Sequence, residues 1–149
     1  MVKLGMEFKI PSKVEKLVGK FQNNGADIYV VGGAVRDLIL GREVKDWDFT
    51  TNLKPEEVQK IFPKNSFYNN KFGTISIVDG EDIFEVTTFR TERGYSDARH
   101  PDEIKWGKTL EEDLQRRDFT INAMAIKIQN PPALRAPSLD KEGFSNIRL

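Results

Sequence analysis

The sequence has 149 residues, with 23 Lys and Arg against 23 Asp and Glu, no Cys and a single His. This length accommodates one domain with a real core, and the zero net charge excludes a global field that would draw the chain to nucleic acid. The lack of Cys excludes disulfides and thiolate metal sites, and one His disfavours a multi-histidine zinc site, so a metal is expected to have oxygen ligands.

The first elements predicted are a packing helix over residues 11–24 and an apolar strand over Ile28 to Val31. The strand runs into Gly32-Gly33, where backbone N–H groups can approach an anion because no Cβ stands in the way. This pair favours phosphate binding, although a tight turn alone explains it equally well. The helix residues at apolar spacing are Val14, Leu17, Val18 and Phe21.

A short helix is predicted after the glycines, buried through Leu38, Ile39 and Leu40 and ended by Gly41. Arg36 lies one turn into it and could reach a triphosphate with its planar fork of donors. The alternative is a salt bridge from Arg36 to Asp37 or Asp48.

Asp46 and Asp48 are predicted to share a second strand. Residues i and i+2 of a strand point to the same face with Cα atoms about 6.5 to 7 Å apart, so the two carboxylates can converge on one site. Together they repel unless a cation lies between them, and oxygen ligands with open positions suit Mg²⁺. The alternative is a solvated strand face. Trp47, between them, is expected to point to the core.

Residues 51–62 predict another helix with Val58, Ile61 and Phe62 facing inward, and Pro63 ends it. From Ser66 to Arg90 the pattern has a period of two and predicts a hairpin with strands over 74–78 and 83–89 and a turn at Asp79-Gly80. Glu85 in the second strand is a candidate third metal ligand. Its alternative role is an ordinary ion pair with Arg90 or a lysine.

Residues 91–108 are polar and nearly free of periodicity, which predicts a mobile surface loop, either functional or a solvated linker. Thr109 and Glu112 form a capping-box pattern, so a helix is expected to start there and to bring Arg116 and Arg117 near its end. A final strand is predicted over 126–129, before an irregular, Pro-rich tail.

Two blocks of sequence together resemble a known family. Residues 32–48 read Gly-Gly-x-x-Arg-Asp, then Gly, then Asp-x-Asp, and residues 112–125 read Glu-Asp-Leu-Gln-Arg-Arg-Asp-Phe-Thr-Ile-Asn-Ala-Met-Ala. Both patterns, in this order, resemble the class II tRNA nucleotidyltransferases, which include CCA-adding enzymes, and the bacterial poly(A) polymerases. The resemblance covers about residues 27 to 127, the catalytic head. It implies an α/β (α+β) fold, a small mixed β-sheet with flanking helices of the polymerase-β-like nucleotidyltransferase type.

The resemblance also implies roles for individual residues. Asp46 and Asp48 would hold two Mg²⁺ ions. Relatives in the family have a glutamate at the position of Glu85, which favours a role for Glu85 in the same site. Arg117 would contact the nucleotide with support from Asp118 and Asn122, and Gly32, Gly33 and Arg36 would position it. The block containing Asp97, Arg99 and His100 resembles a flexible element of the enzymes that add A.

The implied activity is template-independent transfer of nucleotides from ATP and/or CTP to the 3′ end of tRNA or another RNA. The neck, body and tail of the family are not recognised, so residues 1–129 are expected to form the head and 130–149 an irregular tail. A second chain or further domains are then expected to complete the enzyme.

Two alternatives stay open, an incomplete NTP·Mg²⁺-binding module and a nucleotidyltransferase with a non-RNA acceptor, although the Gly-x-Ser signature of that second branch is missing. No apolar run approaches the roughly 20 residues of a membrane span, and no signal-peptide pattern begins the chain, so a cytoplasmic protein without membrane contact is expected.

Overall fold

The structure is a computed structural model that describes residues 8–70, 73–95, 101–117 and 123–129. The helices are α1 (Ser12–Asn23), α2 (Gly33–Ile39), α3 (Pro55–Ile61) and α4 (Leu110–Gln115). The strands are β1 (Ile28–Val31), β2 (Asp48–Thr51), β3 (Ser66–Asn70), β4 (Thr74–Asp79), β5 (Asp82–Thr88), β6 (Arg90–Tyr95), β7 (Pro101–Trp106) and β8 (Ala125–Ile126). No helix in this part of the chain is long and apolar enough to cross a membrane.

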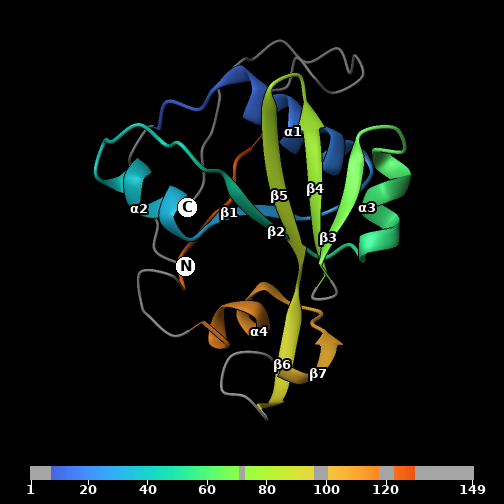
Figure 1. Cartoon of the computed structure of the whole chain (residues 1–149). Helices are drawn as coiled ribbons and strands as arrows, with labels where there is room; N and C mark the ends of the chain where they lie inside the picture. The colour runs from blue at the N-terminus through green and yellow to red at the C-terminus, as the bar shows by residue number, and fades with distance from the viewer. Residues whose placement is uncertain (1–7, 71–72, 96–100, 118–122, 130–149) are drawn as a thin grey trace.

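Six strands form one mixed sheet in the order β3-β4-β5-β2-β1-β8 (Figure 1). Strands β2 and β5 pair in parallel, and the other neighbours pair antiparallel. The parallel pair needs a crossover, which α3 and the β3–β4 hairpin supply. The α/β class with a small mixed sheet and flanking helices is therefore confirmed.

Helices α1 and α3 cover one face of this sheet, and the hydrophobic core lies between them and the strands (Figure 1). The predicted apolar residues of α1 are all buried. On the strands, Phe49 packs edge-on against Phe84 with ring centroids 6.1 Å apart, and Trp47 lies on the same face, 6.3 Å from Phe49. Trp47 thus points to the core as predicted.

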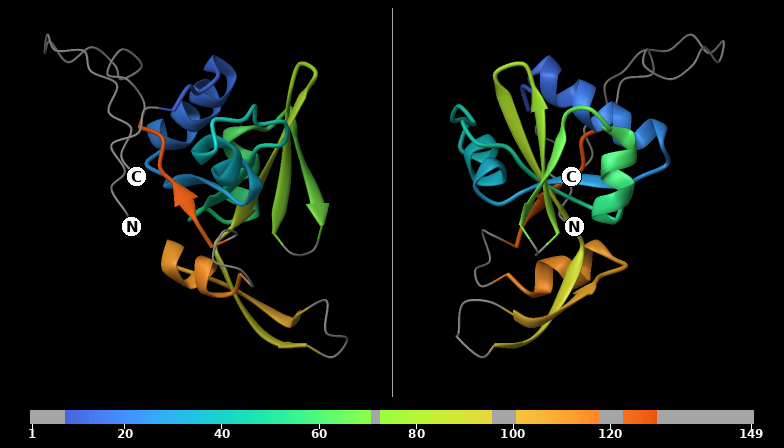
Figure 2. Two further views of the ribbon diagram at one scale, coloured as in Figure 1. Left: turned by 90° about the vertical axis from the view of Figure 1, so that its left-hand side faces the viewer. Right: turned by 45° about the vertical axis from the view of Figure 1, so that its right-hand side comes forward.

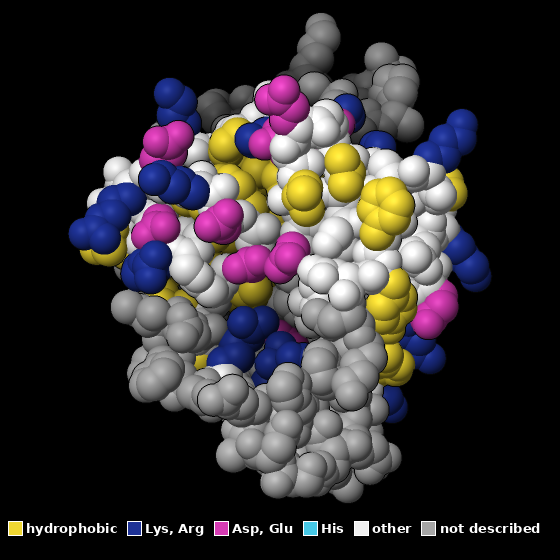
Figure 3. Space-filling model, viewed as in Figure 1, with side chains coloured by type: hydrophobic (Ala, Val, Ile, Leu, Met, Phe, Trp, Pro, Cys, Tyr) yellow, Lys and Arg dark blue, Asp and Glu magenta, His cyan; other side chains and the backbone are white. Residues whose placement is uncertain are grey.

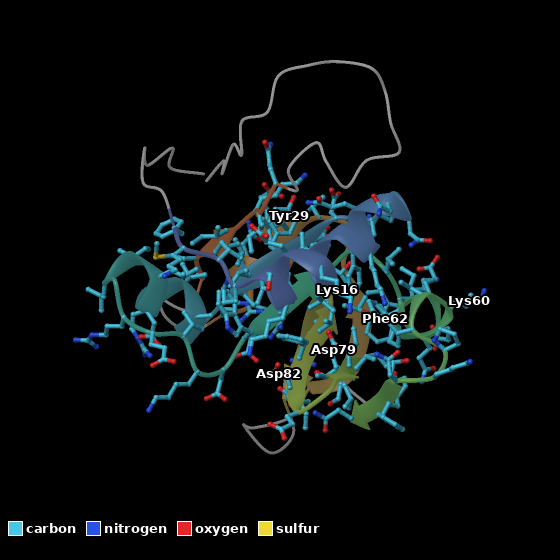
Figure 4. The ribbon with its side chains drawn as sticks, turned by 90° about the horizontal axis from the view of Figure 1, so that it is seen from above. Lys16, Tyr29, Lys60, Phe62, Asp79 and Asp82 are labelled. Atoms are coloured by element: carbon cyan, nitrogen blue, oxygen red, sulfur yellow. The ribbon has the colours of Figure 1, made fainter. Side chains whose placement is uncertain are left out.

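Lysines of α1 tie this helix to the tip of the β4–β5 hairpin. Lys13 Nζ lies 2.6 Å from Asp82 Oδ1, and Lys16 Nζ lies 3.8 Å from Asp79 Oδ2. In Figure 4, which is seen from above, α1 lies over the strands, and Lys16 lies near Asp79 and Asp82. Asp79 and Asp82, two of the three acidic residues at the hairpin tip, are therefore balanced by cations from the covered face.

The predicted burial of Leu40 and two predicted boundaries are wrong. Leu40 is 54% exposed, because it lies two residues after the buried Leu38 and so about 200° around the helix. The helix α3 begins only at Pro55, because Thr51 still pairs with β1 and β5. The β4–β5 turn lies at residues 80–81, since Asp79 pairs with Asp82.

The prediction of a mobile loop over 91–108 is wrong for most of that segment. Strands β6 and β7 form a separate antiparallel pair with Arg90 opposite Trp106, beside α4 and below the main sheet (Figure 2). Backbone hydrogen bonds define these strands, and a polar two-stranded ribbon needs no apolar periodicity. The final strand is also shorter than predicted, since β8 holds only two residues.

Candidate active site

Asp48 is the first residue of β2 and lies where three strands meet. It is opposite Val31 of β1 and opposite Glu85 of β5. Directly paired residues of neighbouring strands point to the same face, so the two carboxylates project side by side. The bare face of the sheet, away from α1, thus carries two of the three predicted acidic ligands.

The prediction of a strand holding both aspartates is wrong for Asp46. Asp46 lies in an exposed bend before β2, because the partner strand β1 ends at Val31 and the chain turns away at Gly32. The charge of Asp46 still acts on Asp48. The structure therefore keeps the two aspartates near one another without a strand to align them.

Gly32 forms the turn between β1 and α2 and faces the Asp48 carboxylate. Its φ of 69° and ψ of −140° are strained for any residue with a side chain. A Cβ at this position would also stand 3.9 Å from Asp48 Oδ2. The positive φ therefore requires glycine at this turn, and the backbone of Gly32 lies close to the Asp48 carboxylate. The approach of this backbone to a phosphate stays a prediction.

The carboxylates of this site crowd one another. Burial raises the pKa of the Asp48 carboxyl above its usual value, the charges of Glu85 and Asp46 raise it further, and Arg117 partly offsets them. Asn69 Nδ2 donates to Glu85 Oε1 at 2.9 Å, so the hydrogen-bond partner of Glu85 among the described residues is an amide. A cation at this site would relieve the repulsion.

Arg117 is held toward the site by a buried carboxylate that sequence reasoning missed. Asp113 in α4 is fully buried and accepts from Arg117 Nη2 at 3.1 Å and from Arg116 Nε at 3.1 Å. It also accepts from the Thr50 hydroxyl at 3.3 Å and the Arg90 backbone N–H at 3.3 Å. The spacing of three and four residues before the arginine pair is the signal that could have identified it.

The capping box that starts α4 is confirmed. Thr109 Oγ1 accepts from the Glu112 N–H at 3.3 Å, and Glu112 Oε2 accepts from the Thr109 N–H at 3.3 Å. It fixes the start of the helix, and the helix then carries Asp113, Arg116 and Arg117 below the sheet. In Figure 3, acidic side chains at the centre of the face lie above a group of basic side chains.

Arg36 takes the alternative role considered for it. Its Nε lies 3.0 Å from Asp37 Oδ1, and its guanidinium lies over Gly33, with Nη2 3.4 Å from where a Cβ would stand. Arg36 thus borders the glycine turn while paired with its neighbour.

Four predicted site residues, Asp97, Arg99, Asp118 and Asn122, lie outside the described residues. Within the described ranges, no group of three or more acidic, His or Cys side chains is placed to hold a metal ion. A cavity of about 520 Å³ opens between β1, α2, α4 and β8, lined by Tyr29, Val35 and Phe89 among others. None of the three carboxylates lines it, since Asp48 and Glu85 lie on the open face of the sheet and Asp46 lies in the bend before β2.

The fold is that of a nucleotidyltransferase head. The chain belongs to the family described as "Poly A polymerase head domain", whose model matches residues 28–134. It is similar to the CCA-adding enzyme of Lactobacillus helveticus, 45% identical over 116 residues, 78% of this chain and 29% of that one. With the CCA-adding enzyme of Geobacillus stearothermophilus it is 46% identical over 110 residues, 74% of this chain and 27% of that one.

Solved structures agree. The Bacillus stearothermophilus CCA-adding enzyme in complex with CTP matches with a TM-score of 0.67 at 40% identity, over 78% of this chain and 27% of that one. The Thermotoga maritima CCA-adding enzyme complexed with tRNA matches with a TM-score of 0.59 at 33% identity, over 81% of this chain and 27% of that one. The chain spans less than a third of the length of these relatives.

Proposed function

We propose that this chain is the catalytic head of an enzyme that adds nucleotides without a template to the 3′ end of tRNA or another RNA. AMP and/or CMP would come from ATP and CTP, with release of pyrophosphate. The observation that carries the proposal is the pairing of Asp48 with Glu85 beside Gly32 and Arg117, in a chain similar to CCA-adding enzymes.

The donor set fits Mg²⁺. Asp46, Asp48 and Glu85 offer only oxygen ligands. Burial and, after it, the charges of Glu85 and Asp46 raise the pKa of Asp48, and a cation would relieve the charge repulsion. These side chains do not enclose an ion by themselves, which suits a metal whose remaining ligands are water and substrate phosphates. Two bound Mg²⁺ ions would activate the 3′-hydroxyl and neutralise the leaving pyrophosphate.

Residues of the chain would orient the nucleotide. The backbone at Gly32 and Gly33 can approach the triphosphate because no side chain intervenes. Arg117, anchored by Asp113, presents positive charge to the carboxylate site and would offset phosphate charge as the bond to the leaving group breaks. We include Arg36, Asp118 and Asn122 as nucleotide contacts, and Asp97 and Arg99 as loop contacts, on the family resemblance.

Incubation with labelled ATP and CTP, Mg²⁺ and tRNA lacking its 3′ end tests the proposal. Addition of A alone, C alone or the complete CCA end separates the possible activities by product length.

Asp48→Asn is expected to lower incorporation at least about a thousandfold, since a carboxylate essential to phosphoryl transfer is lost, whereas the exposed turn variant Glu81→Gln should retain it. Unchanged incorporation by Asp48→Asn would refute the assignment.

The loss should not come from unfolding. Because the folded state raises the pKa of Asp48, it disfavours the charged carboxylate, and folding stability is lost as pH rises from the usual value through the raised one. At pH 7, the Asp48→Asn variant should therefore have the same or a slightly higher free energy of unfolding. The increase should be less than about 1 kcal/mol, because solvent screens the charges around this residue.

One alternative has a specific observation in its favour. Since the chain spans less than a third of its relatives, it would bind NTP·Mg²⁺ without turnover if other domains or a second chain are needed. Calorimetric binding of ATP or CTP without any extended product would support this alternative.

A further inference from the structure

One face of the β3–β4–β5 part of the sheet is bare and carries exposed apolar side chains. Helices α1 and α3 lie on the other face, and no helix of the described residues covers this one (Figure 1). Phe67 is 58% exposed and Ile83 is 62% exposed, and Val78 lies opposite Ile83 on the same face. We call Phe67, Val78 and Ile83 the β3–β5 face.

The sheet register joins this face directly to the candidate active site. Phe67 pairs with Ser76, Ser76 pairs with Glu85, and Glu85 pairs with Asp48, so a single row of side chains crosses four strands on one face. Ile83 lies two residues before Glu85 on β5 and therefore points the same way. Figure 3 shows hydrophobic side chains over these strands beside the central acidic ones.

The two reactants must approach Asp48 from different sides. In phosphoryl transfer the attacking and leaving oxygens lie roughly in line, on opposite sides of the transferred phosphorus. The side of Asp48 toward β1 and α4 holds the glycine turn and Arg117, where the proposed function places the triphosphate. On the opposite side of Asp48 lie Glu85 and then, along the row of side chains, strands β4 and β3.

We propose that the β3–β5 face binds the last unpaired nucleotides of the acceptor RNA. The proposal rests on the proposed function and adds the place where the second substrate lies. At about 4.8 Å between strands, Phe67 stands roughly 14 Å from Asp48, a distance that nucleotides two to four from the 3′ end can span. A base stacks on an exposed aromatic ring whatever its identity, which suits an enzyme that works without a template.

The surroundings of the face favour RNA. Ser76 lies in the row, and Asn69 contacts Glu85 beside it; both side chains carry groups that can hydrogen-bond a ribose or phosphate. At the hairpin tip, Asp79 and Asp82 are paired with lysines of α1 and so repel phosphates less, while Glu81 of the turn is exposed. Continuity with the carboxylates sets this face apart from Leu40, which is similarly exposed just after the end of α2.

Variants of the face are compared with a matched control on another surface. Phe67→Ala and Ile83→Ser remove apolar contacts from the β3–β5 face, Phe67→Trp preserves an aromatic ring, and Leu40→Ala removes an exposed side chain elsewhere. The assays are the KM for tRNA lacking its 3′ end, the KM for the nucleotide, and fluorescence anisotropy of a labelled single-stranded RNA. Anisotropy requires no turnover, and thermal unfolding confirms that each variant folds.

Phe67→Ala and Ile83→Ser should weaken RNA binding and raise the acceptor KM about tenfold, while the nucleotide KM stays unchanged. Phe67→Trp and Leu40→Ala should behave like the unaltered chain.

Unchanged RNA affinity in both face variants overturns the proposal, as does an equal rise in both KM values. A change in oligomeric state at unchanged RNA affinity would overturn it too and identify a protein interface. RNA binding through Phe67 without incorporation would overturn the proposed function alone.

Discussion

Asp113 shows how a single buried charge can organise the surface above it. Its carboxylate accepts from two arginines that follow it in the chain, from the Thr50 hydroxyl of β2 and from the backbone N–H of Arg90. The last two of these bonds join β2 and β6 to α4. Since no part of Asp113 is exposed, its charge is stable only while both arginines stay in place.

Replacement of Asp113 by Asn should therefore be costly. The variant leaves Arg116 and Arg117 without their shared counter-charge, which is expected to lower the free energy of unfolding by about 3 to 5 kcal/mol. Urea denaturation measures the loss. Glu111→Gln, an exposed change on the same helix, should alter stability by less than about 0.5 kcal/mol. A loss below about 1 kcal/mol for Asp113→Asn would show that the carboxylate does not anchor the arginines.

At the level of single residues, sequence predicts the chemistry of the site better than its geometry. The glycine turn and Asp48 follow from residue type and spacing, because a positive φ requires glycine and a strand end exposes its first side chain. Asp46 departs from the expected strand because β1 ends first. Asp113 was missed because burial of a carboxylate depends on contacts between α4, β2 and β6 that are remote in sequence.

The β6–β7 ribbon is joined to the main sheet through Gly73. The φ of Gly73 is 88°, and a Cβ there would stand 2.5 Å from Cζ3 of Trp106 at the end of β7. The Gly73 carbonyl also accepts from the Thr88 N–H at 3.1 Å. The indole ring thus packs directly on the backbone where β4 begins.

A pair of glycine variants isolates this contact. Gly80 has a φ of 63°, and a Cβ added there would meet no atom within 4 Å, so Gly80→Ala should cost only backbone strain of about 1 to 2 kcal/mol. Gly73→Ala should cost about 1 to 3 kcal/mol more, because Trp106 must also move. Thermal or urea unfolding measures both. Equal losses would show that the indole does not hold the ribbon against the sheet.

Strands β6 and β7 of this ribbon were not predicted from the sequence, for a physical reason. Helices such as α1 have an apolar stripe that burial imposes, and so their positions can be read from the sequence. The strands β6 and β7 pair only with each other in a two-stranded sheet, and their pairing depends on backbone hydrogen bonds. Backbone pairing leaves no periodic signal in a polar segment, so 91–108 resembles a loop.

Over the whole molecule, the two faces of the main sheet have different uses. One face holds the core beneath α1 and α3, and the other carries the carboxylates and the β3–β5 face. The balanced charge of the chain, 23 basic against 23 acidic residues, supplies no general attraction for RNA. Under the proposal, RNA affinity would come mainly from local contacts, among them stacking on Phe67.

This balance predicts a shallow salt dependence of RNA binding. Each phosphate neutralised on a single strand contributes about −0.7 to the slope of log K against log salt concentration, and one or two contacts would give about −0.7 to −1.4. Anisotropy titrations of single-stranded RNA at several salt concentrations measure the slope. Phe67→Ala should lower the affinity at every salt concentration without altering the slope, because stacking releases no counterions. A slope steeper than about −3 would instead require several phosphate contacts, and binding would then depend on basic side chains rather than on the apolar face.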